Sequence, residues 1–591
     1  MDAIWTVYGK RADFKAIGDK FLIDQVIARI IRNREVIGDA NIDTYLNGTL
    51  EDTHDPMLMK DMEKGCRIIA GKILEKKSIR IISDYDVDGV MSNYILLDGL
   101  YNAGADVSYE IPDRMLDGYG INERIINDAH NDGIDTIITC DNGIAAFSAI
   151  ELAKSYGMTV VVTDHHEVFY ELDENGDKKY KMVDADAIID IKQEDCRYPF
   201  KGLCGAGVAY KFIRCLYDMM GLKWDDPMRY IDMLAIATQC DVMSLTDENR
   251  IYVKYGLEHM INTDNVGLRA LLMACGLEGK KIYSYHLGFV IGPCINATGR
   301  LESAKRGLEL LLTKDDIKAR HIAEELKELN IKRKEMTNNG VKEAICQVND
   351  NYLNDTVLVI YMPDLHESLA GIVAGRVREH FYKPTIVMTN SENGLRKGSG
   401  RSIEGYHMFD ALVECGEYIE KFGGHELAAG LSVLPDKLDD LRIALNKKQH
   451  LTQEQLTPTV RLDVPMPISY ITTTLVNQLS LLEPFGKDNE KPLFGQSGLG
   501  IKKASLVGKE GQYVRITFQD DNGYCIDGMD FNADKFTESI KMWFTDEECD
   551  KMFKGLSNNI KIDVAYYPEV NTYNGRTTVQ IKPVAYRKHQ D

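Results

Sequence analysis

The sequence predicts an α/β protein in which a parallel-sheet domain is joined by a long helix to a smaller α/β domain and then to a β-barrel. Three observations predict this order. Short apolar runs alternate with helical patterns up to about residue 245, a charged helical stretch follows Thr313, and β-branched runs separated by Gly, Asn and Asp turns dominate after about residue 455. The expected divisions are a helical N-terminal segment at 1–60, the parallel-sheet domain at 61–312, the connecting helix at 313–349, the second α/β domain at 350–450 and the barrel at 451–591.

The expected strands of the first domain are continuous apolar runs that each end at an acidic residue. Such runs are typical of parallel strands covered on both faces by helices. They are SIRIIS (78–83), DTIITC (135–140) and MTVVVT (158–163). In the connecting stretch, apolar residues at Ile322, Leu326, Leu329 and Met336 fit one face of a long helix. TVLVIYM and KPTIVMT then predict strands of the second domain, and YVRITF, KIDVAYY and TTVQIKPVAY predict strands of the barrel.

Composition limits the class of protein. Of 591 residues, 44% are hydrophobic and 27% are charged, which excludes a disordered chain. The net charge of −21 excludes a uniformly cationic nucleic-acid coat but allows a local basic groove. The twelve cysteines form no C-x-x-C pair, and the chain shows neither a secretory signal nor about 20 consecutive apolar residues. We therefore expect a cytoplasmic protein with reduced thiols and no membrane partner.

The strongest local signal is an acidic turn directly after the first expected strand. In Ser83-Asp84-Tyr85-Asp86-Val87-Asp88-Gly89, carboxylates lie two residues apart and share one face of an extended segment. A calcium loop of the D-x-D-x-D-G type is disfavoured because Ile95 occupies the position of its final glutamate and because a strand precedes the turn. A solvated acidic turn remains the alternative to a metal site.

Two further expected strands end in polar groups, at Asp141-Asn142-Gly143 and at Asp164-His165-His166. The carboxyl ends of parallel strands lie along one rim of a sheet, so these loops would face a common crevice. Asp and His together suit Mn²⁺ or Mg²⁺. Asp241 follows a later apolar helix and, taken alone, is no more than a carboxylate at a helix end.

At these residues the chain resembles a known family. DYDVDG, DNG, DHH and CDVMSL match in order the four motifs of the DHH phosphoesterase superfamily. Over nearly the whole chain, further segments resemble the RecJ family of single-stranded-DNA exonucleases: IPDRMLDGYG, CGAGVAYKF, GPCINATGRL, GIVAGRVREHFYKPTIVM, GSGRSIEGYHMFDAL, FGGHELAAG and LEPFGKDNEKPLF. The resemblance implies DHH, DHHA1 and OB-type domains. It also implies a metal-dependent exonuclease of DNA repair and recombination that degrades single-stranded DNA from 5′ to 3′ into 5′ mononucleotides.

The resemblance also implies roles for individual residues. Asp86 would hold the first of two ions, and Asp88 would hold the second. Asp84 would be an outer ligand of the first ion, or would support its ligands without touching the ion. Asp141 would bridge the ions, and His165 and Asp241 would complete the second site. His166 would face the phosphate as a donor or acid, so that the catalytic set is His166, Asp141 and Asp88. The mixed Asp/His set favours Mn²⁺, with Mg²⁺ also able to support activity.

Recognition of the 5′ phosphate is likewise implied by the family motifs. Guanidinium and hydroxyl groups suit this task, and the implied set is Arg114, Arg300, Ser399 and Arg401, with His425 and His366 lining the same cleft. For each arginine alone, a surface ion pair is the alternative. Cys294 stands where related chains commonly carry an arginine, which predicts a weakened contact with the strand.

The expected partner is single-stranded DNA, supplied by a single-stranded-DNA-binding protein or a helicase to a monomeric enzyme. In the barrel, the candidates for base stacking are Tyr513, Phe518, Tyr524 and Phe531, although aromatic residues in strands also form cores. Two other functions stay open from the sequence. One is a phosphodiesterase of short oligonucleotides or cyclic dinucleotides, and the other is a non-catalytic DHH scaffold of replication.

Overall fold

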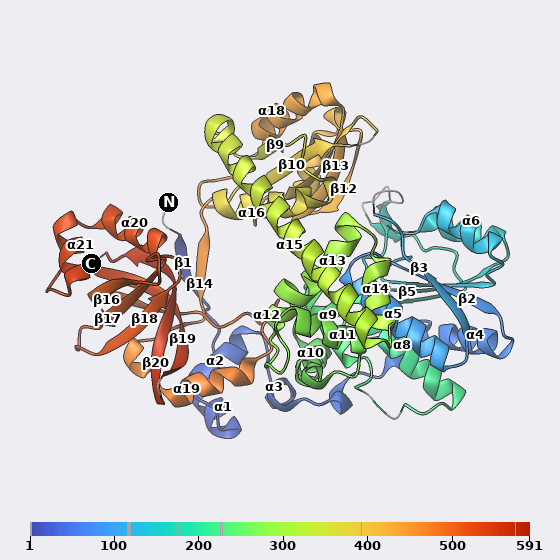
Figure 1. Ribbon diagram of the computed structural model, residues 1–591, viewed down its shortest axis with the longest axis horizontal. Helices are drawn as coiled ribbons and strands as arrows, with labels where there is room; N and C mark the ends of the chain where they lie inside the picture. Colours follow the sequence, from blue (N-terminus) through green and yellow to red (C-terminus); the bar gives the residue numbers. More distant parts are fainter. Residues whose placement is uncertain are drawn as a thin grey trace. The chain divides into compact units, whose positions relative to one another are not determined.

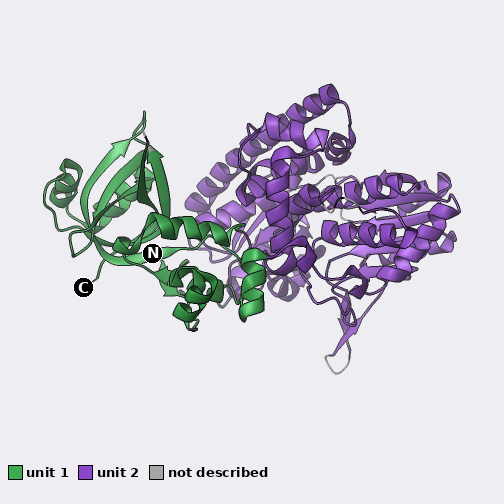
Figure 2. Cartoon of the chain, turned by 90° about the horizontal axis from the view of Figure 1, so that it is seen from below, with its two compact units in different colours: residues 1–47, 450–485, 489–591 green, residues 48–449, 486–488 purple. Residues whose placement is uncertain are grey.

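The structure is a computed structural model that describes residues 3–114, 120–173, 177–224, 226, 228–391, 393–573 and 575–590. Residues 115–119 of the IPDRMLDGYG motif therefore lie outside the described residues. The chain forms two compact units, coloured in Figure 2. The larger unit contains residues 48–449 and 486–488, and the smaller contains residues 1–47, 450–485 and 489–591.

A five-stranded, wholly parallel sheet lies at the centre of the first α/β domain (Figure 1). Its order is β3-β2-β4-β5-β8, with bounds β2 Ser78–Ser83, β3 Asp106–Glu110, β4 Thr136–Cys140, β5 Thr159–Asp164 and β8 Ala187–Asp190. The three strands expected from apolar runs are confirmed as the adjacent strands β2, β4 and β5. A short hairpin, β6 Tyr170–Leu172 and β7 Lys178–Tyr180, precedes β8.

Helices cover both faces of this sheet, which explains why its strands lack polar alternation. Ile81 and its neighbours pack with α4 Met62–Leu74, α5 Val87–Asn102 and α8 Gly205–Met220 on one face. Ile82, on the opposite face, packs with α6 Glu123–Asn131 and α7 Phe147–Ser155. Further helices complete the domain: α9 Ile231–Cys240, α10 Asp247–His259, α11 Val266–Ala274, α12 Ser284–His286, α13 Gly292–Leu301 and α14 Lys305–Leu312.

The expected long helix is α15, Asp316–Gln347, which leads into the second α/β domain (Figure 1). Ile322 and Leu326 are buried, as the helical spacing predicts. The second domain has a mixed sheet of order β12-β13-β11-β10-β9. Its elements are β9 Leu358–Tyr361, α16 Ala370–Phe381, β10 Thr385–Asn390, β11 Arg396–Arg401, α17 Met408–Glu414, β12 Lys421–His425, β13 Ala428–Val433 and α18 Leu438–Lys448.

The smaller unit contains the expected barrel. Its sheet order is β15-β16-β17-β18-β20-β19, and pairing of β16 with β19 closes five of these strands. The elements are β15 Val464–Pro465, α19 Thr473–Leu479, β16 Phe494–Val507, β17 Tyr513–Gln519, β18 Cys525–Asp530, α20 Ala533–Trp543, α21 Asp546–Lys554, β19 Lys561–Tyr573 and β20 Arg576–Lys588. Phe518 is fully buried and belongs to the barrel core, whereas Tyr513, Tyr524 and Phe531 are exposed.

The N-terminal segment belongs to this smaller unit. It contains β1 Ile4–Val7, α1 Phe14–Phe21, α2 Gln25–Asn33 and α3 Asp39–Asn47. β1 pairs in parallel with β14, Thr459–Leu462, and Arg34 forms a buried ion pair with Asp463 at 2.7 Å. No helix among the described residues combines the length and the apolar character that crossing a membrane requires.

Candidate active site

The acidic loops of the parallel sheet converge at the carboxyl ends of β2, β4 and β5. Asp84 follows β2 directly, and Asp86 caps α5 by accepting a hydrogen bond from the Gly89 amide at 3.1 Å. Asp141 follows β4 with a φ of 58°, a left-handed conformation that is unfavourable for a residue other than glycine. Such strain is concentrated at functional sites, so the conformation of Asp141 indicates a constrained role.

Three groups of side chains could hold a metal ion: one joins Asp141 and His165 with His166, and the other two contain all six residues predicted as metal ligands. Each group has one potential ligand atom per residue, and within a group these atoms lie within 4.8 Å of one another. The latter two groups are Asp84, Asp86 and Asp141, and Asp88, His165 and Asp241. His165 links the two, because its Nε2 lies 3.0 Å from Asp141 Oδ1 and 3.7 Å from Asp241 Oδ2.

Burial and the like charges of neighbouring carboxylates disfavour the charged forms of four of these residues, Asp84, Asp86, Asp141 and Asp241. Burial, reinforced by the charge of Asp86, raises the pKa of Asp84 to about 7. Burial and the charge of Asp88 raise the pKa of Asp241 to about 8 and the pKa of Asp141 well above its ordinary value. Divalent cations would remove this repulsion, and Asp84 Oδ1 is a buried oxygen without a hydrogen-bond partner among the described residues. The donor set therefore fits divalent metal ions.

The start of α8 positions the carboxylate of Asp88. The amides of Gly205 and Ala206 donate to Asp88 Oδ2 at 2.6 Å and Oδ1 at 2.8 Å. These two hydrogen bonds from the N-terminus of α8 fix the orientation of the Asp88 carboxylate. Gly205 also lies against Asp141, because a Cβ at residue 205 would be 2.7 Å from Asp141 Cβ. One glycine thus contacts both groups.

Asp164 orients the two histidines that follow it. This buried carboxylate accepts hydrogen bonds from the backbone amides of His165 and Ile144 and, at 2.7 Å, from Nδ1 of His166. Burial alone would lower the pKa of His166, but the hydrogen bond and charge of Asp164 outweigh it and raise the pKa to about 9. The side chain of His166 is 40% exposed. It is therefore a protonated and accessible donor at neutral pH.

Three of the arginines predicted to bind phosphate form a cluster. Burial and the neighbouring guanidinium groups of Arg114 and Arg333 lower the pKa of Arg300 to about 10. Burial and the charges of Arg378 and Arg114 lower the pKa of Arg401. Like charges gathered in this way are suited to a multiply charged anion such as a terminal phosphate.

The remaining predicted phosphate ligands lie on neighbouring strands. Arg401 Nη1 donates to Ser399 Oγ at 2.8 Å, since both side chains lie on the same face of β11. Arg401 and His425 both pair with Ala428, from β11 and β12 on either side of β13, which places them at one level of the sheet. Among the described residues no hydrogen bond joins His425 to Arg401. Arg300 Nη1 donates to the carbonyl of Ser368 at 2.7 Å and thereby connects α13 with the second domain.

Comparisons with known proteins agree with this organisation. Three family models match: the DHH family, N-terminal domain, at residues 78–238, the DHHA1 domain at 354–450 and the RecJ OB domain at 462–584. The single-stranded-DNA-specific exonuclease RecJ of Dickeya dadantii is 30% identical over 579 residues, which cover 94% of this chain and 95% of that protein. The chain belongs to the RecJ family.

Other RecJ proteins show the same extent of similarity. RecJ of Escherichia coli is 30% identical, with 88% of this chain and 89% of that protein covered. RecJ of Bacillus subtilis is 33% identical over 89% of this chain, which spans only 65% of that longer protein. Among solved structures, RecJ from Thermus thermophilus in complex with Mn²⁺ shares the fold, with a TM-score of 0.80, 24% identity and coverage of 100% of this chain and 80% of that chain. A structure of exonuclease RecJ bound to manganese has 28% identity and a TM-score of 0.58, and the match covers 67% of this chain and 96% of that chain.

Some residues that shape the site of this RecJ-family chain are not predicted from the sequence. Asp164 was visible as part of the DHH motif, but its role as a buried acceptor depends on the turn after β5. Arg333 and Arg378 add charge to the arginine cluster, and only Arg378 lies within a motif that the sequence singled out. Their spacing along the chain carries no signal of their proximity.

Cys294 occupies a buried position in this RecJ-family chain. Its Sγ accepts a hydrogen bond from Asn330 Nδ2 of α15 at 3.4 Å and lies 3.9 Å from the Sγ of Cys275. The side chain therefore packs between helices.

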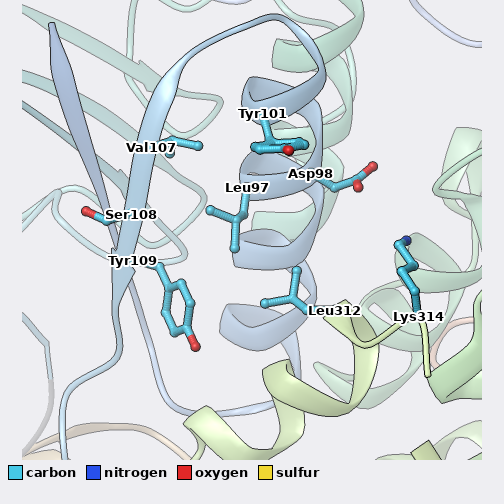
Figure 3. Close-up of a pocket in the computed structure, with 8 residues that line it drawn as sticks. All are labelled: Leu97, Asp98, Tyr101, Val107, Ser108, Tyr109, Leu312 and Lys314. Carbon is cyan, nitrogen blue, oxygen red and sulfur yellow. The ribbon is translucent and has the colours of Figure 1, made fainter. Parts of the chain in front are cut away.

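A separate cavity of about 440 Å³ lies on the same domain (Figure 3). Its walls come from α5, β3 and the segment before α15: Leu97, Asp98, Tyr101, Val107, Ser108, Tyr109, Leu312 and Lys314. None of the predicted metal or phosphate ligands lines this cavity.

Proposed function

We propose that this RecJ-family chain is a metal-dependent exonuclease that degrades single-stranded DNA from 5′ to 3′ and releases 5′ mononucleotides in DNA repair and recombination. The observation that carries the proposal is the occurrence of two groups of potential metal ligands, one of three aspartates and one of two aspartates with His165, beside an arginine cluster. Arg114 lies over the ring of Tyr85, at 5.2 Å from its centroid, and Tyr85 stands between Asp84 and Asp86 in the chain. A phosphodiester at the acidic groups would thus have a terminal phosphate site beside it.

The proposed cofactor is a pair of divalent ions, Mn²⁺ in preference to Mg²⁺. Asp84 and Asp86 would hold the first ion, Asp88, His165 and Asp241 the second, and Asp141 would contribute to both. Bound ions of this kind supply an activated water and neutralise charge on the phosphodiester. The solved structure of exonuclease RecJ bound to manganese, which is 28% identical, supports the choice of Mn²⁺.

The chain's own residues supply proton transfer and orientation. His166, held by Asp164 and protonated at neutral pH, donates to the phosphate and then to the leaving oxygen. Asp88 is held in place because two backbone amides of α8 donate hydrogen bonds to its carboxylate. Asp141 is fixed by its strained backbone and by contact with Gly205. Together, Asp88, Asp141 and His166 form the proposed catalytic set.

End recognition is assigned to Arg114, Arg300, Ser399, Arg401 and His425, which bind the 5′ phosphate. The 5′ phosphate thereby sets the position of the first phosphodiester relative to the acidic groups, which yields mononucleotides. We further propose that the enzyme acts as a monomer in the cytoplasm, on single strands that a single-stranded-DNA-binding protein or a helicase supplies.

The experiment compares strands labelled and blocked at either end, in the presence of Mn²⁺. A 5′-phosphorylated strand with a blocked 3′ end should be degraded to mononucleotides, and a strand with a blocked 5′ end should not. Asp141→Ala should abolish hydrolysis and Arg401→Ala should raise KM, with both variants folded by circular dichroism. Degradation of dinucleotides alone, or equal rates from both ends, would contradict the proposal.

A further inference from the structure

A pair of exposed aromatic rings lies on the surface of the larger unit. Tyr285 of α12 is 62% exposed, and Phe289 in the following π-helical turn, Leu287–Ile291, is 63% exposed. Their rings stack with centroids 5.0 Å apart and planes 18° apart. Single exposed apolar residues are ordinary on protein surfaces, but two exposed rings that stack on each other form a short aromatic stack that a third flat ring can extend. Such a stack suits the face of a nucleobase.

The helical turn that carries these rings packs on the end of α9, directly before the metal-site residue Asp241. A Cβ at Gly288 would be 4.0 Å from Gln239 Cγ, and Cys240 Sγ donates a hydrogen bond to the carbonyl of Leu287 at 3.5 Å. Gln239 and Cys240 are the two residues that precede Asp241 in the chain. The aromatic pair is therefore anchored to the same helix end as Asp241.

A cation from a distant part of the sequence lies at the same helix end. The segment 486–488 belongs to the larger unit, and the backbone amide of Leu245 donates a hydrogen bond to the carbonyl of Lys487 at 2.9 Å. A Cβ at Gly486 would be 3.2 Å from Gln239 Oε1, so this segment and the aromatic turn both contact Gln239. Lys487 is exposed, and its charge acts on Asp241.

We propose that Tyr285, Phe289 and Lys487 form a track that binds the nucleotides on the 3′ side of the scissile bond. This inference rests on the proposed function. The arginine cluster adjoins Asp84 and Asp86, which assigns the 5′ terminal phosphate to that group of ligands. The rest of the strand has to pass the second group of ligands, Asp88, His165 and Asp241. The aromatic pair and Lys487 lie at the end of α9, directly before Asp241. Stacking supplies sequence-tolerant contacts, and the lysine neutralises one phosphate.

The test measures kcat/KM for a 5′-phosphorylated 20-nucleotide strand and for a 5′-phosphorylated dinucleotide, which places only one nucleotide on the 3′ side of the scissile bond and so leaves most of the track empty. In Tyr285→Ala/Phe289→Ala, the ratio of the two values should fall about 5-fold to 100-fold, the effect of losing a stacked base. Tyr101→Ala is the matched control, because Tyr101 is 72% exposed on α5 and is not part of the proposed track. An unchanged ratio, or an equal change in the control, would overturn the inference.

Binding is measured separately from cleavage. With oligo(dT) of 20 nucleotides in EDTA, fluorescence anisotropy at several salt concentrations should show that Lys487→Ala makes the negative slope of log K against log salt shallower by about 0.7. If the protein binds oligo(dT) through Tyr285 and Phe289 but cuts no DNA, the proposed function is refuted and the proposed strand-binding track is still supported. Binding that is insensitive to all three residues would refute the track even in an active nuclease.

Discussion

Substitution of Gly205 by alanine offers a test of how closely the site is packed. Gly205 opens α8, donates its amide to Asp88, and leaves no room for a side chain: an added Cβ would lie 2.7 Å from Asp141 Cβ and 3.0 Å from its Cα. Carbon atoms in ordinary contact are about 3.5 to 4.0 Å apart. Gly205→Ala therefore requires Asp141, or the start of α8, to move by about 1 Å.

The expected cost falls on activity more than on stability. A misplacement of about 1 Å in a catalytic constellation costs about 100-fold in rate. Overpacking of this kind destabilises by about 1–3 kcal/mol, and the better helix propensity of alanine returns up to about 1 kcal/mol. We expect kcat/KM for Gly205→Ala to fall about 100-fold while the melting temperature falls by only a few degrees.

The assay follows release of mononucleotides from a 5′-phosphorylated strand over a range of Mn²⁺ concentrations, together with thermal unfolding. Gly71→Ala is the matched control, since Gly71 lies in α4 and a Cβ there would have no atom within 4 Å. The control should keep its activity and gain slightly in stability. If Gly205→Ala retained kcat/KM within about threefold of the unmodified protein, the inferred contact between residue 205 and Asp141 would be wrong.

Three further predictions concern buried charge. Burial raises the pKa of Asp84 to about 7 and that of Asp241 to about 8 from an ordinary carboxyl value of 3.8. In the metal-free protein the folded state therefore binds protons more tightly than the unfolded state. The stability that results is fully present below about pH 4 and is lost as the pH rises through 8. The increase in melting temperature on adding Mn²⁺ should therefore be larger at pH 8 than at pH 6, and a smaller increase at pH 8 would contradict this. Lys211→Met leaves the charge of its fully buried partner Glu248, 2.8 Å away, without a counter-charge. The free energy of unfolding, measured with denaturant, should fall by about 3–5 kcal/mol, and an unchanged unfolding midpoint would contradict this expectation. Asp164→Asn removes the carboxylate that keeps the pKa of His166 high, so the alkaline limb of the pH–rate profile should move to lower pH, and an unmoved limb would argue against His166 as the acid.

The sequence predicts the architecture of the parallel-sheet domain well because its signals are local. Strands buried on both faces appear as unbroken apolar runs, and β2, β4 and β5 are found within one residue of the expected bounds. The acidic residues follow directly from the strand ends, so the convergence of Asp84, Asp141 and His165 is a consequence of the parallel order.

Features that depend on contacts between distant segments have no such signal. The pairing of β1 with β14 joins residues more than 450 positions apart, and neither strand shows a pattern that specifies its partner. Asp241 entered the predicted ligand set only through the family motif, since a carboxylate at the end of an apolar helix has many explanations. Lys487 is similar: the PFGKDN segment is visible in the sequence, but its contact with Leu245 depends on the folded unit.

The two charged clusters share one physical logic. Burial and neighbouring carboxylates raise the pKa values of Asp84 and Asp241, and burial and neighbouring guanidinium groups lower the pKa of Arg300 to about 10. Each cluster of like charges is therefore electrostatically unfavourable on its own. A fold selected for stability alone would separate such charges or replace them. Cations at the carboxylates and a phosphate at the arginines would relieve the repulsion within each cluster, so that ligand binding would gain the free energy that folding leaves unfavourable. A net charge of −21 is compatible with a nucleic-acid substrate, because a few gathered cationic groups can hold a phosphate without a basic surface over the whole protein.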